Sequence, residues 1–210
     1  MFESILIAGT FDRLHEGHYR LLRSAFRNGH FVEIWLSDDS MCAVKSKAKG
    51  QELLSFKKRS EAVATWCNQQ SKESVDLKDD VDGEEALNEV HMRHSSILGK
   101  LEKVEEKKRS EEKSLCNNTS IPPPPPPLDP QFPYRSRFSI HELPDALGPS
   151  TIEPRYCAIV CSEETLTGCQ AINEARLRNG LNPLDVIVTP LVFGQSGEKL
   201  SSTALRTGKV

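Results

Sequence analysis

The chain has 210 residues, of which 37% are hydrophobic and 27% charged, with a mean hydropathy of −0.46. This length suffices for one domain with a sizeable core. The formal net charge of −3 gives no electrostatic case for a nucleic-acid or membrane partner. No apolar run approaches the roughly 18 residues of a membrane span, and the first residues lack the basic start of a secretion signal. We therefore expect a cytoplasmic protein.

The most informative stretch follows a short apolar run near the start of the chain. That run predicts a strand over residues 2–8, and a loop with the sequence Gly9-Thr10-Phe11-Asp12-Arg13-Leu14-His15-Glu16-Gly17-His18 follows it. The apolar spacing then predicts a helix over 16–28, which Asn28-Gly29 ends. A helix start offers unpaired N–H groups and the positive end of the macrodipole, so it favours phosphate. Two histidines on the first turn can both face that phosphate, which suggests nucleotidyl transfer.

The remaining pattern alternates strands with helices. We predict a strand over 31–36, a basic loop over 45–50 and a helix near 53–69. Strands over 137–141, 156–161 and 184–192 and a helix over 166–179 follow, and Ser201 or Ser202 caps a terminal helix. This order is typical of an α/β, Rossmann-like fold, a parallel sheet with helices on both faces. Ligands of such sheets bind at the carboxyl ends of the strands, where the loop after the first strand lies.

Residues 71–135 read as a long polar insertion that divides the α/β domain into 1–70 and 136–210. It ends in six prolines, Pro122–Pro127, which favour polyproline II. Six positions before them are spaced 3, 4, 3, 4 and 3 residues apart: Leu87, Val90, His94, Ile97, Leu101 and Val104. A single surface helix, a short coiled coil or partner-binding helix over 84–108, and disorder all remain open.

Two signatures resemble those of one superfamily. The loop at 9–18 matches Gly-Thr-Phe-Asp-x-x-His-x-Gly-His, the first signature of nucleotidyltransferases with an HxGH motif. Near the other end, Leu200-Ser201-Ser202-Thr203-Ala204-Leu205-Arg206 matches the second, Ile-Ser-Ser-Thr-x-x-Arg, with Leu for Ile. Further segments resemble the archaeal and eukaryotic type of phosphopantetheine adenylyltransferase: Leu143–Pro149, Ser162–Thr165, Asn173, Arg176 and Gly180-Leu181. The resemblance covers about 1–70 and 136–210.

The resemblance implies transfer of AMP from ATP to 4'-phosphopantetheine, which gives dephospho-CoA and pyrophosphate. The implied catalytic residues are His18, at the α-phosphate, and Lys45, in the basic loop, although alignment does not separate Lys45 from Lys47. The implied nucleotide-binding residues are Gly9, Thr10, Phe11, His15, Gly17, His18, Ser201, Ser202, Thr203 and Arg206. The implied acceptor-binding residues are Thr10, Lys45, Lys47, Arg59, Ser162 and Glu163. We expect Asp12 to fix the loop rather than to move protons.

We expect Mg²⁺ to arrive with ATP, bound mostly through phosphates and water. No carboxylate cluster predicts a dedicated metal site, and the six cysteines lack paired C-x-x-C spacing. Two other functions stay open. One is a sibling adenylyl- or cytidylyltransferase with another small phosphorylated acceptor. The other is an inactive relative that serves as an interaction module, against which the intact His15, His18 and Arg206 argue.

Overall fold

The computed structural model describes residues 1–49, 52–70, 90–92, 131, 133–194 and 197–207, without the side chains of 45–49, 90–92 and 206–207. These residues form one sheet, with strands β1 (Phe2–Gly9), β2 (Gly29–Ser37), β3 (Val90–Met92), β4 (Phe138–Leu143), β5 (Ala158–Ser162) and β6 (Asp185–Thr189). The strand order is β3-β6-β5-β1-β2-β4, and only β3 is antiparallel to its neighbour. The chain runs from β1 to β2 and β4 on one side and returns to β5 and β6 on the other. The topological switch point therefore lies between β1 and β5.

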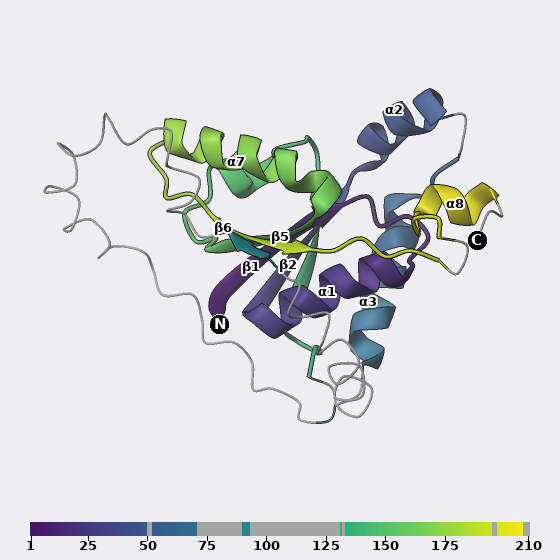
Figure 1. The fold of residues 1–210 in the computed structure, drawn as a ribbon, viewed down its shortest axis with the longest axis horizontal. Helices are drawn as coiled ribbons and strands as arrows, with labels where there is room; N and C mark the ends of the chain where they lie inside the picture. Colours follow the sequence, from purple (N-terminus) through teal and green to yellow (C-terminus); the bar gives the residue numbers. More distant parts are fainter. Residues whose placement is uncertain (50–51, 71–89, 93–130, 132, 195–196, 208–210) are drawn as a thin grey trace, which may run out of the picture.

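Helices cover both faces of this sheet. In Figure 1, α1 (Glu16–Asn28) and α3 (Phe56–Gln69) lie on one side and α7 (Leu166–Arg178) on the other. Two further helices, α2 (Asp39–Lys49) and α8 (Ser202–Thr207), lie beyond the carboxyl ends of the strands. Short 3-10 turns, η3 (Gly148–Thr151) and η4 (Glu163–Thr165), precede β5 and α7. The predicted α/β fold is confirmed. No helix in the described part of the chain is long and apolar enough to cross a membrane.

Side chains from alternate positions of the strands build two cores. Ile5 and Ile7 of β1 join the core under α1 and α3, whereas Leu6 joins the core under α7. Phe26 from α1 lies in the first core and Ile172 from α7 in the second. Because both faces are buried, the inner strands read as continuous apolar runs, as parallel strands do.

The basic segment predicted as a loop is a helix, so that prediction is wrong for residues 45–49. The Asp38 carboxylate caps the N-terminus of α2, where it accepts hydrogen bonds from the Met41 amide (2.7 Å) and the Ser40 hydroxyl (2.8 Å). The ten residues that follow Asp39 contain no proline or glycine, so nothing interrupts the helix before Lys49.

The heptad-like pattern does not give a helix at Val90. Val90–Met92 form β3, whose register against β6 pairs Val90 with Val188 and Met92 with Val186. The open edge of β6 supplies these main-chain partners, and sequence periodicity cannot report a pairing so distant in the chain. The rest of segment 84–108 lies outside the described residues. The limits of the α/β domain stay a prediction. Tyr134 lies two residues before the predicted start of its second part, at 136, and is nevertheless buried in the first core.

Candidate active site

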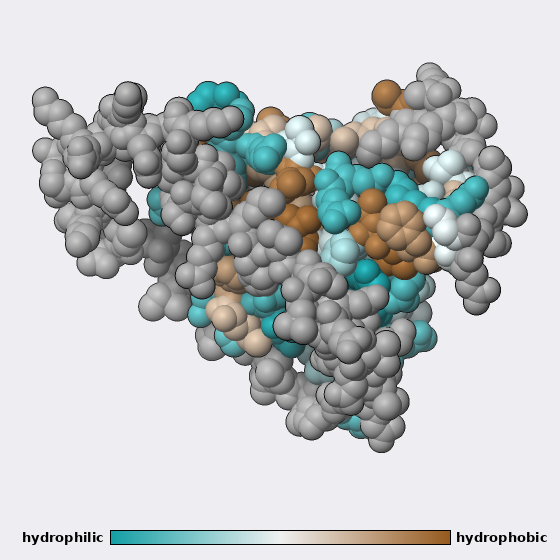
Figure 2. All heavy atoms as spheres, in the orientation of Figure 1, coloured by the Kyte–Doolittle hydropathy of each residue, from teal (hydrophilic) through white to brown (hydrophobic). Residues whose placement is uncertain are grey.

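A cavity of about 550 Å³ opens at the carboxyl ends of β1, β5 and β6, beside the switch point. Its volume lies within the range of small-molecule sites. Figure 2 shows hydrophobic side chains gathered over β5, β6 and the segment that leads towards α8. Ten of the residues predicted from the sequence line the cavity: Gly9, Thr10, Phe11, His15, Gly17, His18, Ser162, Ser201, Ser202 and Thr203. Segments from both ends of the chain therefore share one site.

The loop between β1 and α1 has an unusual backbone. Phe11 (φ 51°) and Arg13 (φ 47°) are both in the left-handed region, which residues other than glycine rarely adopt. The Phe11 ring is buried, 5.1 Å from the His18 ring between centroids. A Cβ at Gly9 would lie 3.0 Å from Cε2 of Phe11, so only glycine leaves this ring in place. The Asp12 carboxylate, 1% exposed, accepts from the Leu54 amide (2.8 Å) and fixes the loop as expected.

His15 caps the start of α1 and its ring lies against that of His18. The Nδ1 atom of His15 accepts a hydrogen bond from the Gly17 amide (3.2 Å), so the neutral ring carries its proton on Nε2. The two imidazoles lie side by side, with ring centroids 4.0 Å apart. A Cβ at Gly17 would lie 3.0 Å from Cε1 of His15 and would push that ring aside. The HxGH spacing thus places two imidazoles at the amino end of a helix of 13 residues.

Both histidines are neutral near pH 7. Burial, and then the neighbouring His15, lower the pKa of His18 to about 3. Burial also lowers the pKa of His15, and the positive charge of Lys199 lowers it further. The Nδ1 atom of His18 is buried and has no hydrogen-bond partner among the described residues. Two neutral rings next to a helix N-terminus can donate N–H groups to an anion, which would in turn raise both pKa values.

The second signature meets the first in this site. The Ser202 hydroxyl donates a hydrogen bond to the main-chain carbonyl of Asp12. The Ser201 hydroxyl accepts from the Ala204 amide (3.1 Å), so Ser201, rather than Ser202, caps α8. Thr203 lines the cavity one residue further along. The fold thus uses both serine hydroxyls in its own structure, and Ser202 couples α8 to the loop that follows β1.

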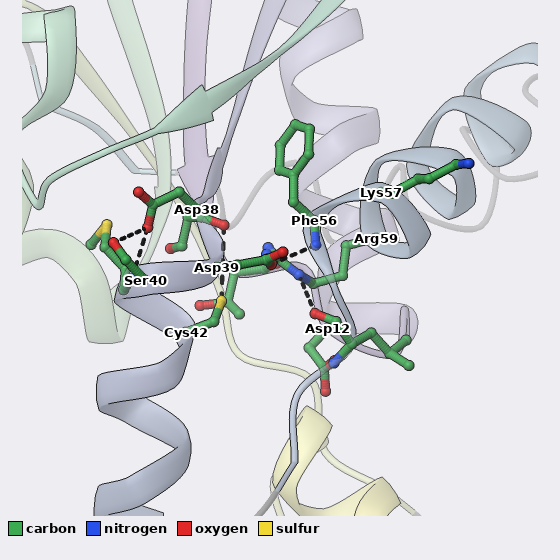
Figure 3. A network of polar contacts seen from close by, with 12 residues as sticks. Asp12, Asp38, Asp39, Ser40, Cys42, Phe56, Lys57 and Arg59 are labelled. Carbon is green, nitrogen blue, oxygen red and sulfur yellow. Dashed lines mark hydrogen bonds and ion pairs between the residues drawn. The ribbon is translucent and has the colours of Figure 1, made fainter.

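Arg59 lies behind the loop and does not line the cavity. Its side chain is 0% exposed, and Nε donates to the Leu54 carbonyl (2.8 Å). One terminal nitrogen donates to the Thr10 carbonyl (2.9 Å), and the other contacts the Asp39 carboxylate at 3.1 Å. Figure 3 shows Arg59 beside Asp39, which also accepts from the Phe56 amide at the start of α3 (2.6 Å). In this arrangement the Arg59 guanidinium fixes the main chain at Thr10 and Leu54 through hydrogen bonds to their carbonyls.

The other predicted residues are placed only in part. Lys45 and Lys47 lie on α2 and Arg206 lies on α8, but their side chains are outside the described residues. Glu163 is exposed in η4 and is not among the residues that line the cavity, whereas its neighbour Glu164 is.

Sequence reasoning missed Lys199 of the cavity wall, and within Ser162–Thr165 it singled out Glu163 rather than Glu164. Lys199 and Glu164 both line the site, and their side chains form an ion pair. Lys199 stands directly before the second signature, but a single lysine in a polar loop carries no pattern. Glu164 is adjacent to Glu163 in the sequence, and only the three-dimensional fold shows that Glu164 is the one that lines the cavity.

Comparison with known proteins shows the family of the chain. A family model described as cytidylyltransferase-like matches residues 6–208. A phosphopantetheine adenylyltransferase from Pyrococcus abyssi is 29% identical over 209 residues, which cover 100% of this chain and 92% of the relative. The protein of the same name from Pyrococcus furiosus is 28% identical, covering 100% and 90%, and that from Methanopyrus kandleri is 29% identical, covering 98% and 89%.

One solved structure, of a protein of unknown function from Archaeoglobus fulgidus, has a TM-score of 0.49 and 16% sequence identity over 89% of both chains. This likeness is too weak to add to the assignment. The family model spans both signatures and runs from within β1 to the end of α8. The chain belongs to the cytidylyltransferase-like family.

Proposed function

We propose that the protein is a phosphopantetheine adenylyltransferase, which transfers AMP from ATP to 4'-phosphopantetheine. One observation carries the proposal: the hydrogen bond from Ser202 to Asp12 holds both signature segments around a single cavity at the switch point. The relatives that cover most of both chains carry this name. The products are dephospho-CoA and pyrophosphate.

The reaction needs little acid–base chemistry from the protein. An oxygen of the acceptor phosphate attacks the α-phosphorus of ATP, and the bond from that phosphorus to the oxygen of the β-phosphate breaks. Pyrophosphate leaves with the electron pair. Because the acceptor phosphate is already anionic at neutral pH, the protein must align the reactants and stabilise the charge of the transition state.

The residues at the start of α1 suit this task. His18 donates an N–H group to an α-phosphate oxygen as negative charge develops there. His15 and the amides at the amino end of α1 contact the same triphosphate, and Thr10 contacts the acceptor phosphate. Lys45 or Lys47 supplies a positive charge to the reacting phosphates. Arg59 acts through the Thr10 carbonyl, as a positioning residue.

The donors that line the cavity suit a Mg²⁺–ATP complex. Among the described residues they are amides, imidazoles, hydroxyls and the Lys199 ammonium, all of which bind phosphate oxygens. Of the two carboxylates in the wall, Asp12 is buried against the Leu54 amide and Glu164 pairs with Lys199. The triphosphate and water would therefore hold the ion, which supplies further neutralisation of phosphate charge.

The test is direct assay of the purified chain. With ATP, Mg²⁺ and 4'-phosphopantetheine, we expect dephospho-CoA and pyrophosphate in equal amounts, measured by chromatography and a pyrophosphate assay. Nicotinamide mononucleotide and glycerol 3-phosphate serve as competing acceptors, and CTP as a competing donor. Faster turnover of either acceptor, or of CTP, would assign a sibling transferase instead.

Absence of turnover with every pair, from a protein that is folded by circular dichroism, would favour the interaction module. A cytoplasmic location and the absence of a nucleic-acid partner stay predictions from the sequence.

A further inference from the structure

Main-chain pairing fixes Lys199 in front of α8. The segment before the helix folds back on itself: the Leu200 amide donates to the Val192 carbonyl (2.9 Å), and the Gly194 amide donates to the Glu198 carbonyl (2.8 Å). Lys199 itself pairs with Phe193 in an isolated antiparallel bridge. Its backbone is therefore set against the segment that leaves β6, and its side chain lines the cavity.

The partner of Lys199 comes from another segment of the cavity wall. Its ammonium contacts the carboxylate of Glu164, which follows β5 in η4. The two side chains are 34% and 53% exposed. An ion pair as exposed as this contributes about 1 kcal/mol or less to stability. A polyanion that enters the cavity can therefore replace Glu164 as the partner of Lys199 at little cost.

Lys199 and both histidines line the same cavity. The positive charge of Lys199 is one of the causes that lower the pKa of His15. With His18 at the α-phosphate, the β- and γ-phosphates are the remaining anionic groups of ATP, and an ammonium in the cavity wall suits them.

We propose that Lys199 binds the β- and γ-phosphates of ATP, and that Glu164 is its counter-ion until the nucleotide replaces it. The inference rests on the proposed function, since it takes ATP as the ligand. It makes Lys199 a nucleotide-binding residue, in addition to those that the two signatures contain. It also means that Glu164 and the triphosphate compete for the Lys199 ammonium. An ion pair that only stabilises the fold would involve no such competition.

The two roles predict different outcomes for the two partners. If the pair only stabilises the fold, Lys199→Gln and Glu164→Gln each break it and weaken ligand binding to the same degree. If Lys199 binds phosphate, Lys199→Gln weakens ATP binding, whereas Glu164→Gln removes the competitor and leaves ATP affinity equal or higher. AMP lacks the β- and γ-phosphates, so both variants should bind AMP with the affinity of the parent protein.

The experiment is isothermal titration calorimetry of the full chain with Mg²⁺–ATP and with AMP. We expect Lys199→Gln to raise the Kd for ATP by about tenfold or more, as loss of a charge-assisted contact does. The Kd for AMP should stay within about twofold of the parent value. Glu164→Gln should not raise the Kd for ATP. Lys57→Gln removes one exposed lysine of α3 and controls for the change in net charge.

Equal weakening by Lys199→Gln and Glu164→Gln, or equal loss of ATP and AMP affinity, would overturn the inference. Lys199→Arg keeps the charge and should bind ATP within about threefold of the parent, which tests the proposal if the glutamine variant does not fold. A parent protein that binds no ATP would instead refute the proposed function. ATP binding that Lys199→Gln leaves unchanged would refute this inference alone.

Discussion

The hydroxyl of Ser202 donates a hydrogen bond to the main-chain carbonyl of Asp12, which lies 190 residues earlier in the chain. The carboxylate of the same Asp12 holds the Leu54 amide in front of α3. One buried residue therefore connects the loop after β1 with two distant segments. The start of α8 is thereby held against the loop that leads from β1 to α1, and both signature segments line one cavity.

Loss of the Ser202 hydroxyl should affect nucleotide binding more than the chemical step. Ser202→Ala removes a hydrogen bond that contributes about 1 kcal/mol. It also lets α8 move relative to the loop after β1. We expect KM for ATP to rise about tenfold while kcat changes less than about threefold, measured by pyrophosphate release. Ser60→Ala removes a hydroxyl bonded to the Lys57 carbonyl, outside the cavity, and should leave both constants unchanged. A larger fall in kcat than rise in KM would contradict this coupling role.

Arg59 and Asp39 should contribute unequally to stability. Replacement of Arg59 by lysine removes the guanidinium that donates to the part-buried carbonyls of Thr10 and Leu54, and each lost partner costs about 1–3 kcal/mol. The Asp39 side chain is 60% exposed, so Asp39→Asn should cost less than about 1 kcal/mol. Urea unfolding of the two variants measures both values. Equal costs would mean that the ion pair, rather than the main-chain contacts, is what Arg59 provides.

Burial of His18 makes the fold sensitive to acid. The folded pKa is lowered from 6.5 to about 3, so between these values the unfolded chain binds a proton that the folded chain does not. The resulting stability is fully present above about pH 6.5 and is lost as the pH falls towards 3, by up to about 1.4 kcal/mol per pH unit.

The histidine can be tested by comparing the parent with His18→Asn. Between pH 7 and pH 5 the parent should lose up to about 2 kcal/mol more free energy of unfolding than the variant. Denaturant titrations at both pH values provide the measurement. His15→Asn is a matched comparison, because the pKa of His15 is lowered in the same direction. Identical pH dependence of the parent and His18→Asn would show that His18 titrates normally.

The insertion should be separable from catalysis. Replacement of residues 71–130 by a Gly/Ser linker removes β3 but keeps Tyr134, which stacks on Phe26 with centroids 4.0 Å apart. Loop-closure entropy changes slowly with length, so we expect a folded enzyme with kcat within about tenfold of the parent. Because β6 then has an uncovered edge, self-association should rise in analytical ultracentrifugation. Loss of both folding and activity would show that the segment belongs to the catalytic domain.

Local signals explain which parts of the fold could be predicted. The helix over 16–28 was predicted to its last residue, because Asn28-Gly29 ends it and its apolar residues repeat at helical spacing. The loop at 9–18 was placed at the binding edge, because a strand precedes it and a helix follows. The apolar residues of the missed helix α2 are mostly consecutive, at 41–44, rather than at helical spacing, and its start depends on the carboxylate of Asp38 as hydrogen-bond acceptor.

Long-range contacts explain the rest. The strand at Val90–Met92 exists as a partner of β6, and the local periodicity pointed to a helix instead. Arg59 is basic and close to the site in sequence, but only the packed structure shows that its donors face the Thr10 and Leu54 carbonyls. Lys199 carries no motif of its own, and the fold alone brings it to Glu164, 35 residues earlier in the chain.

The most direct test of the account is the rate of dephospho-CoA formation by His18→Ala at saturating ATP and 4'-phosphopantetheine, with ATP affinity measured by calorimetry in parallel. If His18 meets charge that develops at the α-phosphate, kcat falls roughly 10²–10³-fold, as on loss of one oxyanion donor. The Kd for ATP should stay within about threefold of the parent value, because the other triphosphate contacts remain. Turnover close to that of the parent enzyme would contradict the account.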